Sequence, residues 1–167
     1  MGIHYTTLGV DTADLAADAV TSAKVADNLV QYAAVELGTA DIAALQATPY
    51  PLVAAAGAGK VIEFIAAQMA YDAGSPATAY TVTGVDDLGI YYGDANGSLL
   101  STEQDATAIL DTAGTADSIT LFDKKEQCVT GVANTPIVLA VSGTGTPADG
   151  NGTMHIKVAY RVYETGL

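Results

Sequence analysis

The sequence predicts an all-β protein: an antiparallel β-sandwich, of the jelly-roll type, that carries an extended N-terminal arm. Residues 153–163 alternate strictly between apolar and mainly polar side chains, as in a strand with one buried face. Other short apolar runs are separated by turns that contain glycine or asparagine. No credible series of helical patterns interrupts them. Many short strands with turn-rich links are typical of a sandwich built from antiparallel strands.

Residues 1–45 form the predicted arm. Large aliphatic side chains recur there with a spacing of five, at Val10, Leu15, Val20, Val25, Val30 and Val35. On a helix this spacing would spread the side chains around the axis instead of gathering them in one stripe. A stack of so few pentads would also not bury its own core.

The arm is therefore expected to pack against a partner, and a symmetric homo-oligomer supplies one, since identical small-residue segments can wind together. These six aliphatic residues are the predicted contacts for oligomerisation or anchoring. A disordered tail is the alternative, because termini are the usual place for disorder. The alanine-rich composition also allows a local helix over residues 39–47, capped by Thr39 or Asp41.

Residues 46–167 form the predicted sandwich body. It opens with two extended apolar runs within residues 48–71, joined by Gly57-Ala58-Gly59, which predicts a β-hairpin. The second run, from Lys60 to Tyr71, is long for a single strand, so a bend or bulge is expected near Ala66-Ala67. Further strands are predicted at 77–83, 88–92, 98–102, 118–122, 127–132, 136–141 and 153–163.

The charge balance excludes several partners. With 6 Lys and Arg against 19 Asp and Glu, the formal net charge is −13, which opposes binding to nucleic acid or to an anionic membrane. Hydrophobic residues make up 50% of the chain, so a folded core is expected despite the charge. The longest apolar runs are too short to span a membrane, and no cleaved targeting segment is expected.

No motif in the chain predicts catalysis or a cofactor. The segment Gly57 to Lys60 lacks the upstream glycine and the following Ser or Thr of a phosphate loop. His4 and His155 lie far apart in sequence, and Cys128 has no nucleophile motif around it. The protein is therefore predicted not to be an enzyme and to use no cofactor and no metal.

Two acidic segments leave other interpretations open. Residues 94–98 place oxygen ligands at alternate positions, as in a calcium loop, but Leu99 replaces the required glycine and Asp105 would have to replace the closing glutamate. An Asn-Gly turn is the simpler interpretation. The pair Asp86-Asp87 would suit glycoside hydrolysis only with a further carboxylate across the bond, and solvated acids on a turn are the simpler interpretation.

Four segments resemble small structural proteins of tailed-bacteriophage virions. Residues 15–28 resemble repeats of phage fibre stems, whereas residues 48–53, 57–62 and 152–160 are similar to β-sandwich proteins of the capsid surface. The resemblance implies a structural role without catalytic residues. It implies a capsid decoration or cement protein, in the form of a homotrimer on the outer capsid surface that stabilises the head by binding the lattice of the major capsid protein.

Two other functions remain open. The protein could be a receptor-binding or glycan-binding protein at the tip of a tail fibre or head fibre, with the arm as its stem and Tyr91 and Tyr92 facing the glycan. A glycan-cleaving enzyme that uses Asp86 or Asp87 is the third hypothesis.

Overall fold

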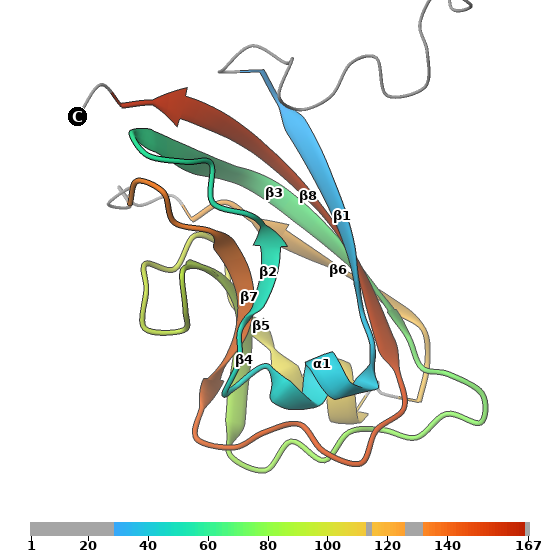
Figure 1. Ribbon diagram of the computed structural model, residues 1–167. Helices are drawn as coiled ribbons and strands as arrows, with labels where there is room; N and C mark the ends of the chain where they lie inside the picture. The colour runs from blue at the N-terminus through green and yellow to red at the C-terminus, as the bar shows by residue number, and fades with distance from the viewer. Residues whose placement is uncertain (1–28, 113–114, 126–131, 166–167) are drawn as a thin grey trace, which may run out of the picture.

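Two antiparallel four-stranded sheets pack face to face in the computed structural model, which describes residues 29–112, 115–125 and 132–165 (Figure 1). The predicted all-β sandwich is confirmed. Sheet A contains, in spatial order, β1 (Gln31–Leu37), β8 (Thr153–Glu164), β3 (Lys60–Asp72) and β6 (Ser118–Asp123). Sheet B contains β2 (Tyr50–Val53), β7 (Ile137–Gly143), β4 (Val85–Tyr92) and β5 (Gln104–Asp105). The helix α1 (Thr39–Ala44) and a short π-helix, η2 (Thr107–Thr112), complete the described elements.

The strand pairs are nested along the chain. β1 pairs with β8, β2 with β7, β3 with β6 and β4 with β5, as if one long hairpin had been folded over on itself. The additional pairs β3 with β8 and β4 with β7 join these ribbons into the two sheets. The jelly roll stays a prediction, and this nested pairing favours it.

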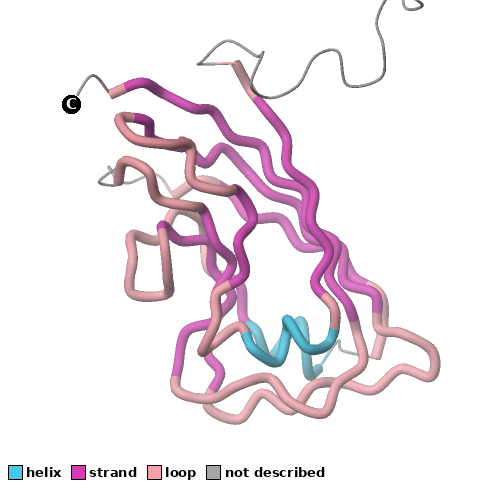
Figure 2. Tube along the Cα trace, in the orientation of Figure 1, coloured by secondary structure: helices cyan, strands magenta, loops and turns pink. Residues whose placement is uncertain are grey.

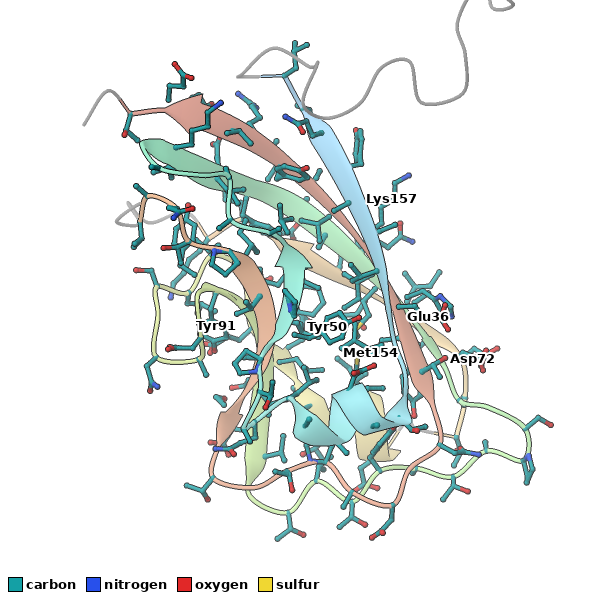
Figure 3. All side chains as sticks on the ribbon, in the orientation of Figure 1. Glu36, Tyr50, Asp72, Tyr91, Met154 and Lys157 are labelled. Atoms are coloured by element: carbon teal, nitrogen blue, oxygen red, sulfur yellow. The ribbon has the colours of Figure 1, made fainter. Side chains whose placement is uncertain are left out.

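The core lies between the sheets, and α1 lies across one end of it (Figure 2). Alternate residues of each long strand face inward, so β8 contributes Met154, Ile156 and Val158, all almost completely buried. In Figure 3, Met154 and Tyr50 point into the space between the layers, whereas Glu36 and Lys157 point away from it. The closing alternation seen in the sequence is thus the inner and outer face of β8.

A bulge in β3 preserves this separation of faces. The register between β3 and β8 shifts between Phe64 and Ala66, which leaves Ile65 as the extra residue. A one-residue insertion exchanges the two faces of a strand. Ile62 and Phe64 are therefore buried before the bulge, and Ala67, Met69 and Tyr71 are buried after it. The predicted irregularity near Ala66-Ala67 is confirmed, just before those residues.

The predicted hairpin over residues 48–71 is wrong. β2 pairs with β7 in sheet B, whereas β3 pairs with β8 and β6 in sheet A. Residues 54–59 cross from one layer to the other, with positive φ angles of 103° at Gly57 and 72° at Gly59. Two apolar runs joined by a glycine turn fit a layer crossing as well as a hairpin, and the partners of each strand lie far along the chain.

The sandwich begins at Gln31, which corrects the boundary predicted after residue 45. β1 is an edge strand of sheet A, and Leu37, Ile42 and Leu45 are fully buried in the core. The local helix that the sequence allowed is present as α1. Its N-cap is Gly38, however, whose N–H donates to the Asp41 carboxylate at 3.0 Å. Residues 1–28 lie outside the described residues.

The remaining strand predictions had mixed outcomes. β4, β6, β7 and β8 are confirmed, whereas residues 77–83 and 98–102 form only isolated bridges, such as Thr81 with Ala148. β5 was not predicted, and its two residues carry no apolar alternation. Most of the predicted strand at 127–132 lies outside the described residues.

Two tyrosines pack on glycines at one end of the core. The Tyr80 hydroxyl donates a hydrogen bond to the Gly152 carbonyl at 2.8 Å, and a side-chain carbon added at Gly150 would overlap the Tyr80 ring. Burial, reinforced by the neighbouring Tyr71, raises the pKa of Tyr80 to about 12. The Tyr80 hydroxyl therefore stays protonated and able to donate near neutral pH.

We expect Gly150→Ala to lower the free energy of unfolding by roughly 1–3 kcal/mol, because the added methyl group displaces the Tyr80 ring from a packed core. Urea unfolding would measure this. Gly38→Ala is the control, because its added carbon would meet only the Asp41 carboxylate, at 3.7 Å. Equal losses in the two variants would contradict the close packing of Tyr80 on Gly150.

Candidate interaction surface

The outer face of sheet B is covered by the chain itself. Tyr91, Val138 and Ala140 point away from the main core and form a second buried cluster with Ala95 and Leu99 of the following loop. The Tyr91 hydroxyl donates to the Glu103 carboxylate at 3.0 Å. Burial first, and then this hydrogen bond and the nearby carboxylates, raise the pKa of Tyr91 far above its usual range. Sheet B therefore offers little apolar surface to a partner.

The outer face of sheet A is open in the described part of the chain. The strand registers align its outward residues in three rows across the sheet. These rows are Tyr32, Ala159, Ala66 and Asp123; Ala34, Lys157, Gln68 and Leu121; and Glu36, His155, Ala70 and Ile119.

Large apolar side chains border this face. Tyr32 on β1 is 66% exposed, and Ile119 and Leu121 on β6 are 68% and 61% exposed. Between them, the central strands β8 and β3 contribute three alanines, Ala66, Ala70 and Ala159, and three longer polar side chains, Gln68, His155 and Lys157. Exposed large apolar residues gathered on one face, with small residues between them, are typical of a protein interaction surface.

Two adjacent hollows follow the middle of the face. One, of about 310 Å³, is lined by residues that include Tyr32, Ala66, Leu121 and Ala159. The other, of about 420 Å³, is lined by residues that include Ala34, Glu36, Ala70 and His155. Gln68 and Lys157 line both hollows, which therefore form one shallow depression, here named the sheet A groove.

Lys157 lies at the centre of the groove. Its ammonium group sits 5.2 Å from the centre of the Tyr32 ring, within the range of a cation–π interaction. Figure 3 shows Lys157 directed outward from β8. Within the described part of the chain, no carboxylate lies within ion-pair distance of Lys157. His155 Nδ1 lies 3.8 Å from Glu36 Oε2 at one end of the groove.

A charged network closes the other end of sheet A. Glu63 accepts hydrogen bonds from Lys124 and, at 2.8 Å, from the Tyr163 hydroxyl, and Arg161 Nε lies 3.8 Å from it. Burial alone would raise the pKa of Glu63, but these hydrogen bonds and the charges of Lys124 and Arg161 outweigh it, so the pKa lies below its usual range. Glu63 therefore ties β3 to β8 and to the chain after β6.

The two layers differ in charge. Apart from Lys24, the lysines and arginines of the chain lie on β3, on β8 or directly after β6. Sheet B instead carries Asp86 and Asp87, and Asp87 faces Asp105 across the strand pair. Burial, followed by repulsion from Glu103, Asp105 and Asp86, raises the pKa of Asp87. The strands of sheet A therefore carry both basic and acidic residues, whereas those of sheet B carry only acidic ones.

The predicted contacts of the arm are only partly described. Val10, Leu15, Val20 and Val25 lie outside the described residues. Val30 is exposed directly before β1. Val35 lies on the inner side of β1, where it is partly buried and packs against the core of its own chain. The contact role of Val35 stays a prediction.

The segments that might hold a ligand have structural roles where they are described. The Asp94 carboxylate accepts the N–H of Asn96 at 2.8 Å, which is the hydrogen bond of an Asx turn. Within residues 29–112, 115–125 and 132–165, no cluster of three His, Cys, Asp or Glu residues could hold a metal ion. None of the helices described there is long and apolar enough to cross a membrane. Cys128 and His4 lie outside the described residues.

Sequence reasoning missed the groove. Its best signal lay in residues 118–123, where Ile119 and Leu121 alternate with Thr120 and Phe122, so that both faces of the strand carry apolar residues. The alanines of the floor gave no signal, because they come from strands distant in sequence that only the register brings together.

Comparisons with known proteins find similarity among solved structures alone. No protein family matches the chain, and no curated protein is similar to it. Among solved structures, a chain of the cyanophage Pam1 capsid asymmetric unit is similar, with a TM-score of 0.41 and 14% sequence identity over 81% of this chain and 85% of that chain.

We expect Glu63→Gln to lower the free energy of unfolding by about 0.5–1.5 kcal/mol at pH 7. The pKa of Glu63 is lower in the folded state than in the unfolded state, so its stabilisation is present above about pH 4.3 and is lost as the pH falls through the folded value. The difference in free energy of unfolding between wild type and variant should therefore become smaller below about pH 4 in urea unfolding series.

The control for this prediction is Glu164→Gln. Its carboxylate lies 3.5 Å from Lys60 at an exposed position, where an ion pair contributes little. A gap between wild type and Glu63→Gln that stayed constant down to pH 3 would show that charge on Glu63 has no role in the network.

Proposed function

We propose that this chain is a structural protein of a tailed-bacteriophage virion, namely a capsid decoration or cement protein. In this role it binds the lattice of the major capsid protein on the outer surface of the head, as a homotrimer, and performs no catalysis. The observation that carries the proposal is the open outer face of sheet A, with exposed Tyr32, Ile119 and Leu121 around an alanine floor. Such a face fits a component that is completed by assembly.

The charge distribution supports the same role. Sheet B and its neighbouring loops carry acids such as Asp86, Asp87 and Asp105 and no lysine or arginine among the described residues. An acidic layer is repelled by packaged DNA and is compatible with an outer position. The resemblance of residues 15–28 to fibre-stem repeats gives the arm a role in assembly.

Cementing requires only selective binding. A protein that binds the assembled lattice and not its dissociated subunits stabilises the lattice in proportion to the logarithm of its own concentration over its dissociation constant. Because a trimer binds through several sites at once, modest contacts combine into one strong attachment. No reaction chemistry is needed.

The two tyrosines suggested to bind a glycan in a fibre-tip protein are not exposed. Tyr91 and Tyr92 are both buried. Tyr91 donates to Glu103, and the Tyr92 hydroxyl donates to the Ile62 carbonyl inside the sandwich. Neither ring is free to stack on a sugar, so this function is not retained.

Antibody labelling of virions tests the location. Purified virions of the phage that encodes this chain would be labelled with an antibody against the full-length protein and imaged by electron microscopy. We expect label over the whole head surface. Label confined to the tail, or its absence from virions, would overturn the proposal.

A surface variant tests the role of sheet A. We expect the double variant Ile119→Lys and Leu121→Lys to fold normally, because both side chains are exposed, and to lose about tenfold or more in occupancy of expanded capsids. Occupancy is measured by co-sedimentation of the full-length protein with capsids that lack it. Val132→Lys, also at an exposed apolar residue, is the control. Unchanged capsid occupancy of the double variant would show that the outer face of sheet A has no role in the assembly.

A further inference from the structure

The sheet A groove is a candidate site for one polypeptide segment. It follows the strand direction between Tyr32 on one edge strand and Ile119 and Leu121 on the other. Ala66, Ala70 and Ala159 leave space above the sheet for a backbone, beside the longer side chains of Gln68 and Lys157. Its two hollows hold side chains of moderate size, and Lys157 supplies a positive charge between them.

Residues 1–28 of this chain match the groove in composition. They contain four aspartates and one lysine, Lys24, so the segment is acidic. From residue 10 onward its large aliphatic residues, Val10, Leu15, Val20 and Val25, are separated mainly by small residues, among which alanine is frequent. Lys157 lies at the centre of the groove with no described carboxylate at ion-pair distance, so it can pair with an aspartate of such a segment.

The length of residues 1–28 allows a neighbouring copy to be the donor of the arm. Leu29 and Val30, directly before β1, are 56% and 45% exposed. An extended segment of 28 residues reaches up to about 90 Å, well beyond the radius of gyration of about 14 Å expected for a sandwich of this length. The segment can therefore span to the groove of another copy.

We propose that a stretch within residues 10–28 of one copy lies in the sheet A groove of a neighbouring copy, so that the trimer is held together by exchanged arms. The aliphatic residues of the arm cover the alanine floor between Tyr32 and Leu121, and an aspartate of the arm pairs with Lys157. This inference rests on the proposed structural role and names the partner of the same surface. The assembled trimer, rather than the bare groove, then binds the capsid.

Disulfide trapping in the full-length protein tests the exchange. In a Cys128→Ser background, a tagged chain with Gln68→Cys in the groove is mixed with untagged chains that carry Leu15→Cys, Val20→Cys or Val25→Cys. We expect at least one pair to give tagged–untagged dimers in about tenfold higher yield than a tagged chain with Asn96→Cys, which is exposed beside sheet B. Equal yields at Gln68→Cys and Asn96→Cys would overturn the exchange.

A chain that carries both cysteines separates the two possible donors. Crosslinks found only within such a chain, and never between tagged and untagged copies, would show that the arm covers its own groove and would also overturn the exchange. Crosslinks between copies support it.

Charge reversal gives an independent measurement. We expect Lys157→Glu to raise the dissociation constant of the oligomer by about tenfold in sedimentation experiments, because the groove then repels the acidic arm. Lys125→Glu makes the same change in net charge just beyond β6 and is the control. Equal effects of the two variants would overturn the role of Lys157.

Virion labelling keeps the two proposals distinguishable. Labelled heads without arm-to-groove crosslinks would overturn the exchange and leave the structural role intact. Crosslinks in the purified protein without label on virions would support the exchange and overturn the virion role.

Discussion

The antiparallel pairing of β3 with β8 is the interaction on which both faces of sheet A depend. Its inner side supplies Phe64, Met69, Met154 and Ile156 to the core, and its outer side supplies the alanine floor of the groove. The bulge at Ile65 keeps these two sets of residues apart over the whole length of the pair. Without that extra residue, every side chain on one half of β3 would change sides, and the core and the groove would be lost together.

The two sheets of the sandwich differ in whether the chain itself covers their outer faces. Sheet B buries Tyr91, Val138 and Ala140 under its own loop and surrounds them with carboxylates. Sheet A has no such cover among the described residues and leaves Tyr32, Ile119 and Leu121 in solvent. β6 is also an edge strand, and an edge with exposed apolar residues is prone to pair or aggregate unless a partner covers it. One face is therefore closed within the chain, and the other is open to solvent in the described part of the chain.

The sequence predicted those parts of the fold in which local pattern and tertiary environment agree. β8 alternates without interruption, so its existence and its inner face followed directly from the order of its residues. The extent of β1 did not follow from the sequence, because the alanines and the valine at residues 33–35 matched the pentad spacing of the arm as well as the period of a strand.

The wrongly predicted hairpin has a similar cause. A glycine turn determines that the chain reverses or crosses, but distant partners determine which sheet each strand joins. The groove was beyond local reasoning, since alanine carries no signal until the register of four strands aligns it.

The size of the groove limits how much of the arm it can hold. Ordering a segment as long as β1, about seven residues, costs on the order of 10 kcal/mol in conformational entropy. Burial of about 400 Å² of apolar surface, summed over arm and groove, offsets a cost of that size. An aspartate that reaches Lys157 then supplies a small net gain, and three such contacts in a closed trimer act together. A longer stretch would add entropy cost without further apolar surface to cover, because the rows end at charged residues: Glu36 and His155 on one side, Glu63 and Arg161 on the other. In the proposed exchange, the rest of the arm is therefore left for contacts outside the groove.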